Sequence, residues 1–189
     1  LGPSGKMLAV GQVTPEGLRR AFKEQASALA DAGPDAIVVE TMMDLEEALI
    51  AAAAAKATGL PVIACLVFDA GKAKDRTMTG ATPEQAVEAL SSIGVDGVGA
   101  NCGQGVEGFI PICRRMRAAT PLPLWMKPNA GLPERVNGQV IYRTTASQFA
   151  SFAPGLVCAG ANFIGGCCGT EGPFIRELGR ALFPGGSRP

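Results

Sequence analysis

The chain has 189 residues, of which 47% are hydrophobic and 18% are charged, so it holds ample apolar material for a buried core. Its 17 basic and 17 acidic side chains balance to zero formal net charge, which argues against a nucleic-acid partner because such proteins carry a basic surface. The apolar runs are shorter than the roughly 20 residues needed to span a bilayer. We therefore expect neither a membrane segment nor a nucleic-acid function.

Five short apolar runs predict the strands of a sheet. They lie at residues 35–40, 61–68, 96–101, 122–127 and 161–166. Each run is almost continuously apolar, which is typical of strands that are covered on both faces. The runs therefore predict a sheet buried between two layers.

Helix-start patterns stand between the predicted strands. Thr14 precedes a proline at the first helical position, and Thr82 and Thr145 each precede a glutamine by three residues, which is the capping-box spacing. The predicted helices cover residues 15–31, 45–57, 83–92, 106–118, 146–153 and 173–182. Strands that alternate with helices in this way form a parallel sheet with right-handed crossovers.

Two architectures fit this alternation, a doubly wound sheet and a (β/α)8 barrel. Residues capable of binding or catalysis follow all five predicted strands: Glu40 and Thr41, Asp69, Asn101 and Cys102, Pro128 and Asn129, Cys167 and Cys168. A doubly wound sheet gathers such residues at one switch point, whereas a barrel gathers them around its whole carboxyl-end rim. The pattern therefore predicts an α/β fold of the TIM-barrel type.

Five strands are too few to close an eight-stranded barrel, which takes about 250 residues. The opening "LGPSGKML" is typical of a loop that follows a strand, with no strand before it. We therefore predict a C-terminal partial barrel of about five βα units over residues 1–183, and a disordered tail at 184–189.

Six cysteines stand at positions 65, 102, 113, 158, 167 and 168, and the chain has no histidine. The even count is compatible with disulfides, but the chain lacks the loop-rich character of a small disulfide-stabilised secreted domain. It also begins without a signal-peptide pattern. We therefore expect free thiols and a cytoplasmic location.

Three of these cysteines follow two different strands, so a barrel would bring their sulfurs together at its mouth. Three thiolates around one point favour Zn²⁺, and a fourth position left open is the mark of a catalytic zinc site. Such a site can hold a substrate thiol as a reactive thiolate. These three are Cys102, Cys167 and Cys168, while Cys65, Cys113 and Cys158 are interpreted as core residues. A redox pair of Cys167 and Cys168 is the alternative, although the usual redox spacing is C-x-x-C.

Several motifs resemble the homocysteine S-methyltransferase family: "GANCGQG" (99–105), "KPNAGLP" (127–133) and "GGCCGT" (165–170), with "GPSGKML" and "VVETMMDLEEA" in support. The resemblance runs from residue 1 to about 183. It implies a (β/α)8 barrel and transfer of a methyl group to the sulfur of homocysteine, giving methionine.

The resemblance also implies roles for individual residues. Cys102, Cys167 and Cys168 match the zinc ligands of the family, and Asn129 matches a residue that occupies the fourth zinc position when substrate is absent. Glu40 matches the glutamate that binds the homocysteine amino group, a charge-assisted hydrogen bond. Asn101 is interpreted as a residue that orients a ligand, or alternatively as a turn residue at a strand end.

The motifs are most similar to the cobalamin-dependent branch of the family, in which methylcobalamin is the methyl donor. The chain shows no cobalamin-binding segment, so a corrinoid would come from another domain or protein. The first strands of the family's barrel have no counterpart here. An inactive or split-barrel portion of such an enzyme, and a thiol–disulfide protein, are therefore the competing hypotheses.

Overall fold

The computed structural model describes residues 1–185; residues 186–189, most of the predicted tail, lie outside the described part. The helices are α1 (Pro15–Asp31), α2 (Leu45–Lys56), α3 (Pro83–Ser92), α4 (Val106–Ala119), α5 (Ala146–Ser151), α6 (Ala153–Cys158) and α7 (Gly172–Leu182), with a short 3-10 helix at Leu8–Val10. The strands are β1 (Ile37–Met42), β2 (Val62–Leu66), β3 (Gly97–Gly105), β4 (Leu124–Asn129), β5 (Glu134–Val136), β6 (Gln139–Ile141) and β7 (Phe163–Ile164).

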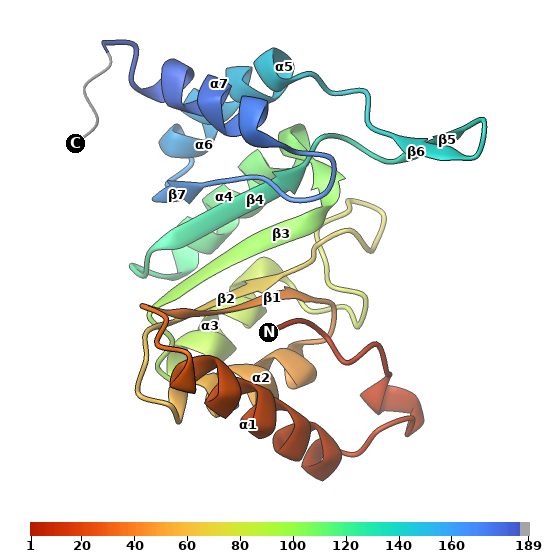
Figure 1. The fold of residues 1–189 in the computed structure, drawn as a ribbon, viewed down its shortest axis with the longest axis vertical. Helices are drawn as coiled ribbons and strands as arrows, with labels where there is room; N and C mark the ends of the chain where they lie inside the picture. Colours follow the sequence, from red (N-terminus) through yellow and green to blue (C-terminus); the bar gives the residue numbers. More distant parts are fainter. Residues whose placement is uncertain (186–189) are drawn as a thin grey trace.

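The main sheet is parallel and has the strand order β1-β2-β3-β4-β7 (Figure 1). Each strand pairs with its neighbour along the chain, so the order never reverses and the sheet has no switch point. Sequential parallel pairing is the topology of a (β/α)8 barrel. The predicted fold, a partial barrel of five βα units, is confirmed.

Local sequence signals account for the helix starts. Thr14 accepts a hydrogen bond from the backbone of Gly17 at 3.1 Å, and Thr82 and Thr145 both form complete capping boxes. The helices predicted at 15–31 and 83–92 have the observed bounds. The helix predicted at 146–153 is wrong in its extent, because the chain forms two short helices that meet at Phe152, with a proline in the first turn of the second.

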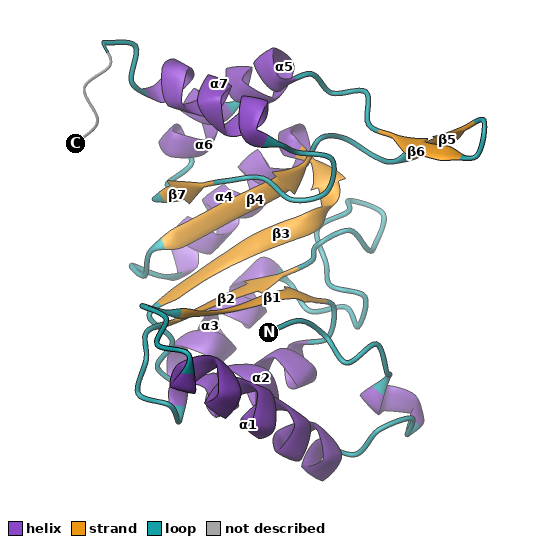
Figure 2. Cartoon of the chain, in the orientation of Figure 1, coloured by secondary structure: helices purple, strands orange, loops and turns teal. Residues whose placement is uncertain are grey.

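The core lies between the sheet and the helices, with α3 and α4 behind the strands in Figure 2. Val39, Val98 and Met126 face this layer and are almost inaccessible to solvent. The opposite face of the sheet, called the inner face here, is only partly covered: Trp125 is half-buried and Phe163 is 55% exposed. The prediction that both faces are buried is therefore wrong for the inner face, because five strands curve without closing around it.

The β5–β6 hairpin has no counterpart in the predicted elements and projects away from the main sheet (Figure 1). Its residues are mostly exposed, so no apolar alternation marked it in the sequence. Among residues 1–185, no helix combines the length and the apolar character needed to cross a membrane.

Candidate metal centre

Three thiols meet at the carboxyl ends of the strands. Cys102 lies near the end of β3, and Cys167 and Cys168 lie in the loop between β7 and α7. Their Sγ atoms all lie within 4.8 Å of one another, and those of Cys102 and Cys168 are 3.8 Å apart. Two thiolates bound at about 2.3 Å to a tetrahedral metal ion are also about 3.8 Å apart, so the spacing fits one shared ion.

The backbone that carries the site is strained. Thr41 and Cys102 both have φ of 63°, a conformation that non-glycine residues rarely adopt and that is least favourable for a β-branched residue such as threonine. Gly169, directly after the cysteine pair, has φ of 76°. Strain of this kind clusters at binding and catalytic sites, where the surrounding structure holds it in place.

Two buried asparagines hold the cysteines in position. Asn101 is fully buried, exchanges hydrogen bonds with the backbone amide (2.7 Å) and hydroxyl (2.8 Å) of Thr41, and lies 3.7 Å from the sulfur of Cys167. Asn129 accepts a hydrogen bond from the backbone amide of Cys168 at 3.0 Å, and its side-chain amide lies 3.7 Å from the sulfur of Cys102. The two side chains therefore link β1, β3, β4 and the cysteine loop into one network.

Burial and the neighbouring thiols raise the proton affinity of Cys168. The pKa of Cys168 is raised to about 11, first by desolvation and then by the neighbouring Cys102 and Cys167. Several thiolates lie close together in proteins when a metal cation binds between them. The cation displaces the thiol protons as it binds. The donor set is therefore suited to a thiophilic divalent ion.

A charged pair lies on the inner face of the sheet. Glu40 of β1 forms an ion pair with Lys127 of β4, whose ammonium also lies 4.5 Å from the ring centroid of Trp125. Lys127 is 8% exposed, which is unusual for a lysine. The sequence reasoning missed it, although a lysine at the end of an otherwise apolar strand is the signal that could have found it.

The other three cysteines lie apart from the cluster. Cys65 and Cys113 are buried, as predicted, and burial raises the pKa of Cys65 to about 12 and that of Cys113 to about 11. The prediction for Cys158 is wrong, because it is exposed. It ends the short helix α6, whose inward-facing position is taken by Leu156 instead.

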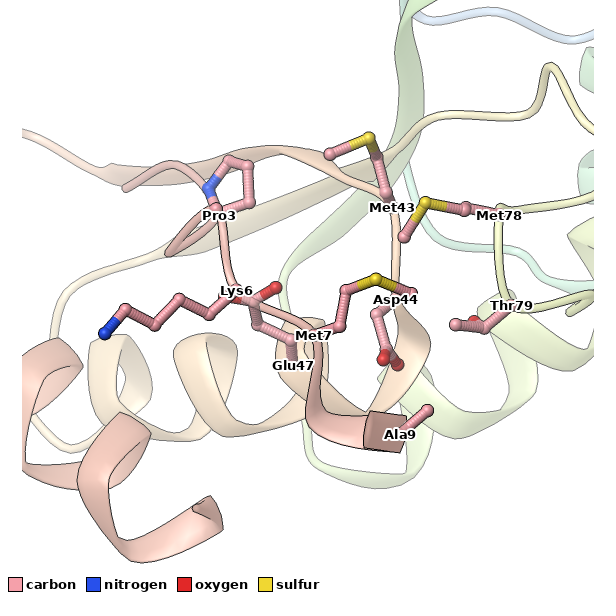
Figure 3. A pocket seen from close by; sticks show the side chains of 10 residues that line it. Pro3, Lys6, Met7, Ala9, Met43, Asp44, Glu47, Met78 and Thr79 are labelled. Carbon is pink, nitrogen blue, oxygen red and sulfur yellow. The ribbon is translucent and has the colours of Figure 1, made fainter. Parts of the chain in front are cut away.

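Two hollows open near this rim. One of about 270 Å³ is lined by six residues: Asp69, Lys74, Gly103, Gln104, Gly105 and Leu132. The other, of about 190 Å³, lies beyond the end of β1, and Figure 3 shows Met7, Met43 and Met78 reaching it from three separate segments. Asp69, which follows the second predicted strand, lines the first hollow, and Thr79 lines the second.

Comparison with known proteins places the chain in a family. A sequence model of homocysteine S-methyltransferases matches residues 1–182. The chain belongs to the homocysteine S-methyltransferase family. It is 28% identical over 186 residues to the methionine synthase of Mycobacterium leprae and 29% identical over 189 residues to that of Mycobacterium tuberculosis, and each match covers 96% of this chain.

Solved structures agree with the fold. The apo form of the homocysteine methyltransferase MmuM from Escherichia coli superposes with a TM-score of 0.76 at 23% identity, covering 96% of this chain and 60% of that one. The metallated form gives 0.75 at 26% identity, covering 94% and 58%. The family member described here thus spans about three fifths of MmuM, and only 15% and 16% of the two methionine synthases.

Proposed function

We propose that the chain forms the homocysteine-binding part of a zinc-dependent methyltransferase that converts homocysteine to methionine. The observation that carries this proposal is the meeting of three thiols, from two strand ends distant in sequence, within 4.8 Å at the carboxyl-end rim. Membership of the family and the likeness to a metallated homocysteine methyltransferase support it. The open sheet face is compatible with further strands completing the barrel.

In this proposal Cys102, Cys167 and Cys168 bind Zn²⁺. When bound, a zinc ion with three thiolate ligands supplies an open position at which a substrate thiol is held as a thiolate. Asn129, whose side-chain amide lies 3.7 Å from the sulfur of Cys102, would occupy the fourth position in the absence of substrate. Asn101 bonds to Thr41 of β1 and contacts the sulfur of Cys167, which supports a role in positioning a ligand over that of a turn residue at a strand end.

The residues of the chain also bind and orient the substrate. Glu40 carries the only acidic side chain of β1 and takes the α-ammonium of homocysteine. The substrate sulfur attacks the methyl carbon with its own electron pair, and the donor keeps the pair of the bond that breaks. We propose methylcobalamin, held by another domain or protein, as that donor, because the relatives in Mycobacterium are methionine synthases.

The experiment is metal analysis of the purified chain and of Cys167→Ser and Cys158→Ser variants. The proposal predicts close to one zinc per chain for the wild type and for Cys158→Ser, and a large loss for Cys167→Ser. Methyl transfer from methylcobalamin to homocysteine is then assayed on the zinc-loaded chain. Zinc without activity would favour the inactive or split-barrel hypothesis, and a reversible disulfide of Cys167 and Cys168 without zinc would favour the thiol–disulfide hypothesis.

A further inference from the structure

The ion pair of Glu40 and Lys127 joins two strands that are not neighbours. Glu40 lies on β1 and Lys127 on β4, with β2 and β3 between them in the sheet. The two side chains therefore reach toward each other over the inner face. The side chain of Glu40 is 47% exposed and that of Lys127 is 10% exposed, so the carboxylate borders solvent while the ammonium lies beneath it.

Lys127 is held in place by its surroundings. The ring of Trp125 lies against its ammonium, with 4.5 Å between Nζ and the ring centroid. Gly165, two residues before the cysteine pair, packs against both side chains: a Cβ there would lie in van der Waals contact, 3.4 Å from Cγ of Lys127 and 3.4 Å from Nε1 of Trp125. A charge kept this far from water requires partners, so a fixed lysine here indicates a binding task.

The pair retains unused hydrogen-bonding capacity. A lysine ammonium has three donors and a carboxylate has two acceptor oxygens. Within residues 1–185, the side-chain hydrogen bonds of both residues are limited to the one between Nζ of Lys127 and Oε2 of Glu40. A ligand can therefore gain bonds from both groups.

The pair also lies beside the thiol cluster. Thr41 follows Glu40 directly and bonds to Asn101, which contacts Cys167. Asn129 lies two residues after Lys127, on the same face of β4, and contacts Cys102. One positive group, one negative group and a thiol-binding site thus share one side of the sheet.

We propose that Lys127 is a specificity-determining residue of this site, whose ammonium binds the carboxylate of the α-amino acid whose own ammonium Glu40 takes in the proposed function. The inference rests on the proposed function, in which the thiol cluster takes the sulfur of the same molecule. A ligand with a single charge would separate the pair and leave one member without a partner. A zwitterion instead replaces one ion pair with two, so the site selects amino-acid thiols over simple thiols.

Trp125 provides a readout that needs no metal, because it is the only tryptophan of the chain and lies against Lys127. Its fluorescence is titrated with methionine, with 3-(methylthio)propylamine, which lacks the carboxylate, and with 4-(methylthio)butyrate, which lacks the ammonium. The wild type is expected to bind methionine about tenfold or more tightly than either analogue, as one charge-assisted bond implies.

The variants separate the two charges. Lys127→Met is expected to bind methionine and 3-(methylthio)propylamine with equal affinity, and its affinity for the propylamine should be close to that of the wild type. Glu40→Gln is expected to bind methionine and 4-(methylthio)butyrate with equal affinity, and its affinity for the butyrate should be close to that of the wild type. Lys127→Arg should restore part of the preference for a carboxylate. Lys56→Met is the matched control, because Lys56 pairs with Asp96 at 2.9 Å away from the site and its loss should leave all three affinities unchanged.

Two results would overturn the inference. The first is equal binding of the three ligands by the wild type. The second is an equal loss of affinity for all three ligands in a Lys127→Met variant that circular dichroism shows to be folded. A lysine that only positions Glu40 or supports the fold would give this result. Cobalt(II) loading tests the proposed function separately. If the thiolate-to-cobalt absorption bands do not change when homocysteine is added, ligation of the substrate thiol is contradicted, and the fluorescence result alone decides on the charged pair.

Discussion

The two sides of the sheet differ in the residues that they bury. On the helix-covered side, Phe109, Leu124 and Met126 are at most 2% exposed and form an apolar layer. At the carboxyl-end rim and on the inner face, the buried residues include Asn101, Asn129 and Lys127. The first side stabilises the fold through burial of apolar area, whereas the second holds polar groups and a strained backbone that favour binding over stability. Substitutions on the two sides should therefore have separable effects.

The largest expected effect comes from a matched pair of phenylalanines. Phe109→Ala opens a cavity in the core and should lower the free energy of unfolding by about 3–5 kcal/mol. Phe163→Ala, at a residue that is 55% exposed and lies 6.1 Å from the Trp125 ring, should cost about 1 kcal/mol. Urea unfolding of both variants measures the difference. Equal losses would show that the inner face supports the fold as strongly as the core does.

The second prediction concerns the asparagine that bridges the cysteines. Asn129→Ala removes its contacts with Cys168 and Cys102, so zinc affinity should fall about 10–100-fold, as expected for loss of a residue that orients metal ligands. Competition with a chromophoric chelator measures the affinity. Asn162→Ala, at an asparagine that bonds the backbone of Leu124 away from the site, is the control and should leave zinc binding unchanged.

The smallest expected effect lies far from the site. Arg115 on α4 binds both carboxylate oxygens of Glu84 at 2.6 and 2.7 Å, and this hydrogen bonding lowers the pKa of Glu84 from 4.5 to about 2. The pair therefore contributes its full stability above pH 4.5 and loses it as the pH falls toward 2. Glu84 is 43% exposed, so screening by solvent limits the contribution to under about 1 kcal/mol.

Urea midpoints measured between pH 6 and pH 2.5 test this pair. The wild type should lose slightly more stability across that interval than Arg115→Met does. A variant that loses as much as the wild type would show that the ion pair contributes nothing, and zinc affinity at neutral pH should be the same in both proteins.

Sequence patterns predicted the parts of the molecule that local physics controls. Thr82 and Thr145 cap helices as their spacing indicates, and the alternation of strands and helices was enough to predict sequential parallel pairing. The thiol cluster was found because cysteines at strand ends are brought together by that topology. Glu40 and Asn129 were also marked by their places at strand ends, but their proposed roles came only from the family resemblance.

The remaining features depend on contacts between distant segments. Thr41 has a positive φ and bonds to Asn101, 60 positions away, and no local signal marks either feature. The pairing of Lys127 with Glu40 spans 87 positions and two intervening strands. Such tertiary contacts override the local preferences of a chain. The features that sequence patterns did not predict therefore concentrate at the site and not in the helices.

In the proposed function, three thiolates of this chain leave one position on zinc for the sulfur of homocysteine. X-ray absorption at the zinc edge, recorded on the zinc-loaded chain before and after homocysteine is added, tests it most directly. We expect three sulfur ligands that become four at about 2.3 Å, with no such change when methionine is added. A coordination shell that stays the same with homocysteine, or one that already contains four sulfurs without it, would contradict the account.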